Sequence, residues 1–246
     1  MTILIRKAAE EEIPAIARLA GQAFHPTTDW ITRQVFPLHL QPKDIPDGQA
    51  SQPWRRLRKT VGFSTPNCAT IVAVDTALNN QIVGYAIWDL PVGSEESPAP
   101  PADPELPADV TDFKVYAELK TILEEDHKAT FGDRGLKDVW RSSSPLLFPL
   151  YIRVLLYKPD MGPQPTNAQT DLDMIGVDPH YQRQGIGRAL LTWGVEQATR
   201  EGRDCYLMAT PQGRPLYESF GFDIVRPLNM FGVMHHSMIL RTSKTT

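Results

Sequence analysis

Two glycines stand one residue apart where a predicted strand meets a predicted helix, in the stretch QRQGIGR of residues 182–188. The apolar run of residues 172–177 predicts the strand, and apolar residues at helical spacing over 186–198 predict the helix. The first N–H groups of a helix lack partners within it and carry partial positive charge, so they favour a bound anion. Because glycine lets an anion approach the backbone, and because Arg183 and Arg188 add positive charge, we predict a pyrophosphate site here. On spacing alone, the alternative is an ordinary turn with two glycines.

Two familiar phosphate-binding motifs do not fit this stretch. A P-loop requires Lys and then Ser or Thr after its second glycine, but Arg188 and Ala189 follow Gly187. A dinucleotide fingerprint requires a third glycine three places after the second, where Leu190 stands. The sequence also contains neither the His-Glu-x-x-His metal motif nor a Gly-x-Ser-x-Gly nucleophile motif, so we expect no metal ion.

Taken with its surroundings, the stretch resembles motif A of the GNAT superfamily of N-acetyltransferases. Gln182, Gly185 and Gly187 match that motif, and the strand "MIGV" followed by "DP" matches its usual lead-in. Downstream, "PLYESFGF" resembles the end of motif B, with Tyr217 four residues before the final Gly221. The resemblance is tight over about 171–226, fair over 3–24 and 69–90, and absent over about 91–165.

The resemblance implies an α/β GNAT fold, in which a mixed central sheet splays apart between two parallel strands and carries helices on its faces. We expect a single domain over 1–246, with a long Pro-rich acidic insertion at about 91–165 between the third and fourth strands. Acetyl-CoA is the implied cosubstrate, bound where the strand ending at Val177 parts from the strand of residues 205–209. The residues implied to hold its pantetheine arm and its pyrophosphate are Ile175, Gly176, Val177, Gln182, Arg183, Gln184, Gly185, Ile186, Gly187 and Arg188.

Acetyl transfer from a thioester to an amine places three demands on a site. The ammonium group must lose a proton, since its pKa is about 10.4. The oxyanion must be stabilised, for which the resemblance implies a backbone N–H near residues 175–177. The leaving thiolate, with a pKa of about 8.5, benefits from a proton donor. Tyr217 occupies the family's general-acid position, although a tyrosine there can also simply pack in the core.

For the base, the sequence offers carboxylates and histidines. Asp171 and Asp173 lie two residues apart in the predicted strand, so both side chains share one face, where mutual repulsion or burial raises a pKa. The alternatives are solvated carboxylates and a chain of water molecules. His235 and His236 are adjacent in the last predicted strand and therefore face opposite sides. One of them can enter the substrate cleft, and a surface or core position is the alternative.

The composition of the chain limits the kinds of binding partner and the cellular compartment that we expect. The net charge is −4 and the pI about 5.9, which gives no general reason to expect nucleic-acid binding. No apolar run approaches the roughly 18 residues of a membrane span. Two cysteines do not form a disulfide scaffold, so we expect a reducing, cytoplasmic compartment. The sequence leaves open a homodimer.

The charge is unevenly distributed along the chain. Residues 89–126 hold eleven acidic and two basic residues, a net charge of −9, which would steer a cationic amine towards the site or merely solvate a loop. A basic cluster at Arg55, Arg56, Arg58 and Lys59 is interpreted as a solvated helix face or as the wall of a substrate or phosphate site. We expect the acceptor to be a small metabolite or xenobiotic amine. The alternatives are a protein lysine or N-terminal amine, and a non-catalytic acyl-CoA-binding module.

Overall fold

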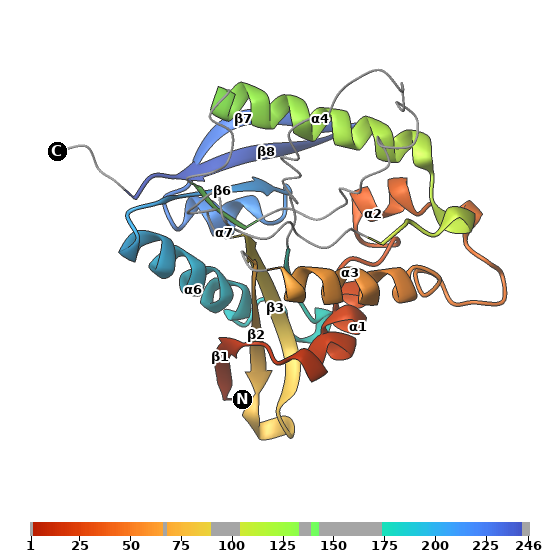
Figure 1. The fold of residues 1–246 in the computed structure, drawn as a ribbon, viewed down its shortest axis with the longest axis horizontal. Helices are drawn as coiled ribbons and strands as arrows, with labels where there is room; N and C mark the ends of the chain where they lie inside the picture. The colour runs from red at the N-terminus through yellow and green to blue at the C-terminus, as the bar shows by residue number, and fades with distance from the viewer. Residues whose placement is uncertain (1, 66–67, 90–103, 133–138, 143–173, 243–246) are drawn as a thin grey trace, which may run out of the picture.

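One mixed β-sheet organises the chain, and helices pack on both of its sides (Figure 1). The computed structural model describes residues 2–65, 68–89, 104–132, 139–142 and 174–242. The strands are β1 Ile3–Lys7, β2 Cys68–Asp75, β3 Gln81–Asp89, β4 Val139–Ser142, β5 Ile175–Val177, β6 Asp204–Ala209, β7 Asp223–Met230 and β8 Val233–Leu240. The α-helices are α1 Ile13–Ala23, α2 Trp30–Val35, α3 Gln52–Ser64, α4 Phe113–Phe131, α6 Ile186–Arg200 and α7 Arg214–Glu218.

The strand order confirms the predicted mixed sheet. It runs β1-β2-β3-β4-β6-β8-β7, with β5 paired to β3. All of these pairs are antiparallel except β4 with β6, which is parallel. Across the described ranges of the chain, no helix is both long and apolar enough to cross a membrane.

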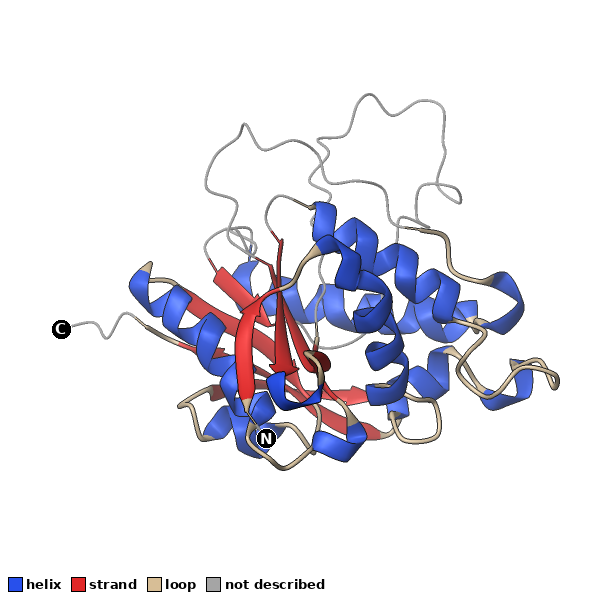
Figure 2. Cartoon of the chain, turned by 90° about the horizontal axis from the view of Figure 1, so that it is seen from below, coloured by secondary structure: helices blue, strands red, loops and turns tan. Residues whose placement is uncertain are grey.

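Helices cover both faces of the sheet because the strands of its first half are apolar on both faces (Figure 2). Alternate residues of a strand point to opposite faces. Ile71 and Ala73 therefore pack with α6 in one core cluster, whereas Val72 and Val74 pack with α1 in another. A further cluster joins α2, α3 and α4 to β6 and β7, and α4 lies along β7 and β8 in Figure 1.

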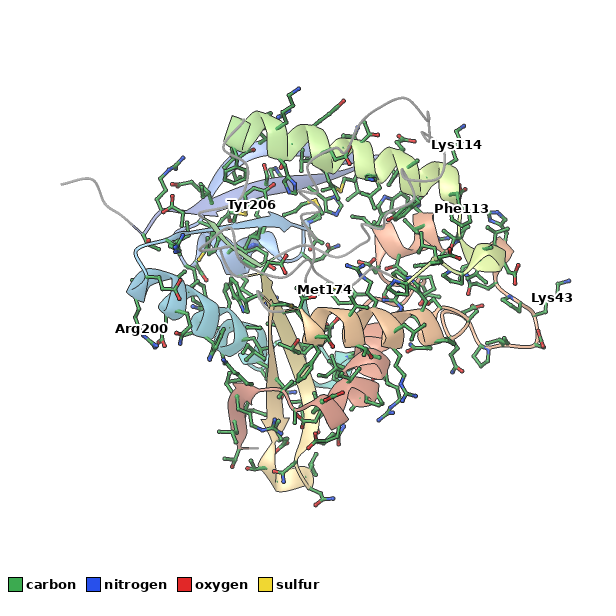
Figure 3. The ribbon with its side chains drawn as sticks, in the orientation of Figure 1. Lys43, Phe113, Lys114, Met174, Arg200 and Tyr206 are labelled. Carbon is green, nitrogen blue, oxygen red and sulfur yellow. The ribbon has the colours of Figure 1, made fainter. Side chains whose placement is uncertain are left out.

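A buried polar network fixes α4 to the sheet. The Asp126 carboxylate accepts hydrogen bonds from the hydroxyl groups of Tyr206 and Ser237, and Arg226 Nε lies 3.8 Å from it. Tyr206 lies beneath α4 in Figure 3. Since a buried carboxylate is costly without partners, these donors explain how Asp126 tolerates its position.

A central strand of the sheet is interrupted. On β3, Trp88 pairs with Ser142 of β4, the N–H of Ile87 donates to the carbonyl oxygen of Met174, and Ala86 pairs with Ile175 of β5. The two short strands thus take consecutive positions along β3, as one continuous strand would. Residues 143–173 are inserted between them, outside the described residues. The segment expected to be a single insertion, 91–165, therefore also supplies α4 and the first half of this strand.

The basic cluster on α3 divides between interior and surface, and neither predicted role fits it as a whole. Arg55 and Lys59 are 5% and 8% exposed, one helical turn apart, whereas Arg56 is exposed. The charged ends lie over aromatic rings, with Arg55 Cζ 5.9 Å from the centroid of Phe36 and Lys59 Nζ 5.1 Å from that of Tyr85. This inward packing was missed because charge alone predicts a solvated face.

A substitution at Gly194 tests how α6 packs against the sheet. A Cβ added there would lie 2.1 Å from two ring atoms of the fully buried Trp88. Gly→Ala inside a helix normally stabilises by about 1 kcal/mol, but overpacking a rigid site costs about 1–3 kcal/mol. We expect Gly194→Ala to lower the melting temperature. Gly187→Ala, on the same helix with its nearest contact at 3.6 Å, is the matched control and should not lower it. Equal melting temperatures for the two variants would refute this packing.

Candidate active site

A cavity of about 850 Å³ opens where β5 and β6 separate. The two strands run in the same direction, and β5 bonds β3 rather than β6. The volume lies in the usual range for small-molecule sites. Residues from five places line it: α1 to α2 (Phe24, Pro26, Thr27, Thr28, Asp29, Trp30, Arg33), β5 (Ile175, Gly176, Val177), the turn before α6 (Tyr181, Gln182, Arg183, Gly185, Ile186, Gly187, Arg188), the end of β6 with α7 (Met208, Thr210, Pro211, Gln212, Gly213, Leu216, Tyr217) and β8 (Val233, His235).

Among the described strands only β3 pairs with β5, and the other edge of β5, its free edge, presents backbone groups to this cavity. Along the β3 ladder, Asp178 N–H donates to Val83, and Met174 C=O accepts from Ile87. Because the alternating residues of a strand direct their backbone groups to opposite edges, Ile175 and Val177 direct theirs away from β3. Gln182 Nε2 donates to the Val177 carbonyl oxygen at 3.3 Å. The N–H groups of Ile175 and Val177 are therefore oriented to serve an extended ligand or an oxyanion.

The α6 turn has the geometry of an anion cradle. Gly185 caps the helix at φ +83°, a conformation that suits glycine, and contributes no side-chain cap. The first backbone hydrogen bond of the helix runs from Ala189 N–H to Gly185, so the N–H groups of residues 186–188 have no helical acceptor. A Cβ at Gly187 would meet Leu216 and Val177 only at ordinary contact distances. The protein itself therefore does not require glycine at 187, which fits a ligand that closely approaches the backbone.

Hydrogen bonds hold three side chains of the turn, those of Gln182, Gln184 and Arg188. Arg188 Nη2 donates to Ser219 Oγ at 2.8 Å, and its guanidinium lies 5.0 Å from the Phe220 ring centroid. Arg183 is exposed at φ +62°. Gln184 donates to the His180 carbonyl oxygen at 3.1 Å and does not line the cavity. Of the ten residues predicted to hold the cofactor, the structure thus brings all but Gln184 to one cavity.

Tyr217 stands on α7 and lines the same cavity. Its ring packs at a tilt against Phe222, with centroids 6.0 Å apart. Burial raises the pKa of Tyr217 to about 12, because a phenolate is poorly solvated there. The hydroxyl is therefore protonated at neutral pH and has a proton to donate.

The two histidines of β8 face opposite sides, as predicted. His235 lines the cavity and is 1% exposed, whereas His236 is half-buried on the other face. Burial lowers the pKa of His235 below its ordinary value. Asp29 is the only carboxylate among the described residues that line the cavity, and sequence reasoning did not single it out. Its place at the N-cap of α2, where it accepts from Thr32 N–H, was the available signal.

Other predicted features lie away from the cavity or outside the described residues. Asp171 and Asp173 belong to 143–173, so their role stays a prediction. The described residues of the acidic stretch 89–126 do not line the cavity. Within the described part of the chain, no cluster of His, Cys, Asp or Glu could hold a metal ion.

Comparison with known proteins agrees with this geometry. The Acetyltransferase (GNAT) domain family matches residues 159–224. An acetyltransferase of the fungus Stachybotrys chartarum is 33% identical over 58 residues, which are 24% of this chain and about a quarter of that protein. Two crystal structures share the fold. The histone acetyltransferase HPA2 and related acetyltransferase of Corynebacterium glutamicum has a TM-score of 0.54 at 18% identity, over 100% of this chain and 99% of that one.

The second structure is the PaiA N-acetyltransferase of Thermoplasma acidophilum in complex with coenzyme A, with a TM-score of 0.50 at 11% identity, over 98% of this chain and 99% of that one. The matched segment contains β5, the α6 turn and Tyr217, the parts that build the cavity. Residues 159–224 therefore resemble a GNAT acetyltransferase domain, and the chain has the fold that the resemblance predicted.

Proposed function

We propose that the protein is an acetyl-CoA-dependent N-acetyltransferase that acts on a small primary amine. The observation that carries this proposal is one cavity that joins the α6 turn, the free edge of β5 and Tyr217. These three features match the pyrophosphate, the thioester and the leaving thiolate of acetyl-CoA. The N-acetyltransferase of Thermoplasma, which binds coenzyme A in its crystal structure, supports the cofactor.

Each part of the cavity has a step in the reaction. The N–H groups at the start of α6 and Arg188 hold the pyrophosphate. A backbone N–H of β5 donates to the carbonyl oxygen as the amine nitrogen attacks the carbonyl carbon, so it stabilises the developing oxyanion. When the C–S bond breaks and its electron pair passes to sulfur, the Tyr217 hydroxyl gives its proton to the thiolate. The attacking nitrogen loses its extra proton to solvent, and solvent reprotonates the Tyr217 phenolate. The products are an acetylated amine and free CoA thiol.

A small amine is the proposed acceptor because Asp29 and Trp30 line the cavity at the start of α2. Asp29 provides a negative charge there, and Trp30 provides an aromatic surface with its Nε1 bonded to the Met230 carbonyl oxygen. A carboxylate and an aromatic face together suit a cation with an apolar body. No disulfide joins Cys68 and Cys205, which suits a reducing compartment, and we place the reaction in the cytoplasm.

The proposal is tested by thiol release from acetyl-CoA over a panel of acceptors, namely alkyl and aryl alkylamines, peptides with one lysine, and peptides with a free N-terminus. We expect amine-dependent release with the small amines and a mass gain of one acetyl group in the product. Turnover confined to peptides would overturn the small-amine proposal. CoA binding without turnover on any acceptor would instead indicate a non-catalytic module.

The predicted carboxylate pair has its own test. If Asp171 or Asp173 is the base, the rate should rise with pH through an apparent pKa that belongs to the pair or to the bound amine. Replacing the true base by Asn should flatten that limb or move it towards the pKa of the amine. Replacing the other carboxylate is the control. Unchanged pH–rate profiles in both single variants and in the double variant would remove the pair from the mechanism.

A further inference from the structure

His235 lies on the opposite side of the sheet from Tyr217. It pairs with Leu228 across the β7–β8 ladder, and residues opposite one another in a ladder share a face. Leu228 packs with α2 and α4, whereas Tyr217 packs with the cluster of α6. Both side chains nevertheless line one cavity. The cavity therefore passes through the gap between β5 and β6, so that an amine arriving beside α2 would meet a thioester held on the α6 side.

The protonation pattern of His235 follows from one contact. Its Nδ1 lies 3.1 Å from the carbonyl oxygen of Val233. A carbonyl oxygen only accepts hydrogen bonds, so the proton of the neutral ring must sit on Nδ1. Nε2 then carries a lone pair, and no hydrogen bond from the described residues reaches it. The local backbone thus fixes the tautomer that leaves Nε2 free to accept a proton.

The surroundings of His235 keep that lone pair available at neutral pH. Burial is the largest effect on the ring and lowers its pKa below 6.5, while the Val233 contact and Asp29 act in the opposite direction and His236 acts with burial. Other charged groups on the neighbouring elements are Arg33 on α2, Arg226 on β7 and Asp126 on α4, the last bonded to Ser237 two residues along β8. The ring is therefore neutral at pH 7, and the nearby Asp29 favours an ammonium group beside it.

We infer that His235 is a catalytic residue whose Nε2 accepts the proton of the acceptor's ammonium group. This inference rests on the proposed function. It adds to that mechanism the base that removes a proton from the acceptor amine. The N–H electron pair stays on the amine nitrogen, which then attacks the thioester carbon, and the imidazolium later returns its proton to solvent. If His235 has this role, proton removal does not require Asp171 or Asp173.

The test compares His235→Gln with His236→Gln, a matched change of the adjacent residue on the other face. The substrate is the panel alkylamine with the highest kcat/KM. In the wild type, kcat/KM should rise through a pKa below 6.5 and be level near pH 7. His235→Gln should lose this limb and about 10²- to 10³-fold in rate at pH 7, within the general-base range. The rate difference between His235→Gln and the wild type should shrink as pH approaches the pKa of the amine, about 10.4, because the amine then reaches the site already neutral.

Nitrogen chemical shifts of the imidazole rings give a second measurement that needs no activity. The His235 signals of the wild type are assigned as those that are absent from the spectrum of His235→Gln. They should show the Nδ1–H tautomer at pH 7 and titrate below pH 6.5. An Nε2–H tautomer, a charged ring at pH 7, or an active enzyme whose rate His235→Gln leaves unchanged would overturn the inference alone. A wild type that acetylates no amine, with folded protein and bound CoA, would overturn the proposed function instead.

Discussion

Gly187→Glu is expected to weaken CoA binding at least 100-fold. The new side chain would start inside the cradle formed by the first N–H groups of α6, where the pyrophosphate is proposed to lie. Two like charges about 4 Å apart repel by about 4 kcal/mol at an effective dielectric constant of 20. A 100-fold loss corresponds to only about 2.7 kcal/mol, so repulsion alone is sufficient. Isothermal titration calorimetry with CoA measures the effect.

Gly187→Gln is the matched control for this result, because it adds the same bulk without the charge. We expect it to bind CoA more weakly than the wild type and more tightly than Gly187→Glu. Circular dichroism should show all three proteins folded, since a Cβ at 187 meets the protein only at ordinary contact distances. A folded Gly187→Glu that binds CoA with wild-type affinity would place the cradle elsewhere.

Tyr217→Phe is expected to lower kcat by about 10- to 10⁴-fold and to change KM for acetyl-CoA little, because it removes only the proton given to the thiolate. The proton donor is active when protonated, and its pKa is raised to about 12. Activity that depends on this proton should therefore be lost only as pH rises through about 12, and no Tyr217 limb should appear between pH 7 and 10. Steady-state kinetics over that range measures both effects.

Tyr181→Phe is the control, since Tyr181 lines the same cavity but lies before α6 and packs with the core cluster of that helix. It should keep kcat close to the wild-type value. An unchanged kcat in Tyr217→Phe, with single-turnover kinetics showing that chemistry limits the rate, would remove Tyr217 from the mechanism.

Local signals explain why the α6 turn was predictable. The glycine pair, the apolar strand before it and the helical spacing after it all lie within about thirty consecutive residues, so periodicity and backbone chemistry identify them together. Tyr217 required the resemblance, because nothing in its own neighbourhood separates a proton donor from a packed tyrosine. The opposed faces of His235 and His236 followed from the twofold period of a strand.

Features that depend on distant pairing were not predictable. Ser142 and Met174 take consecutive places along β3, yet they are separated by the whole of 143–173 in the sequence, and periodicity carries no information about shared partners. Asp29 joins the cavity only because α2 packs beside the β7–β8 hairpin, where Trp30 bonds Met230. The Arg55 side chain points into the protein, where its guanidinium lies over the ring of Phe36. The sequence does not show that these two residues are close in space.

The central claim is that acetyl-CoA lies across this cavity, and a crystal structure of the protein with CoA tests it most directly. We expect the pyrophosphate within hydrogen-bonding distance of the N–H groups of residues 186–188. The pantetheine arm should pair with the free edge of β5, and the sulfur should lie next to the Tyr217 hydroxyl. CoA bound at another surface, or with its sulfur remote from both β5 and Tyr217, would contradict the account.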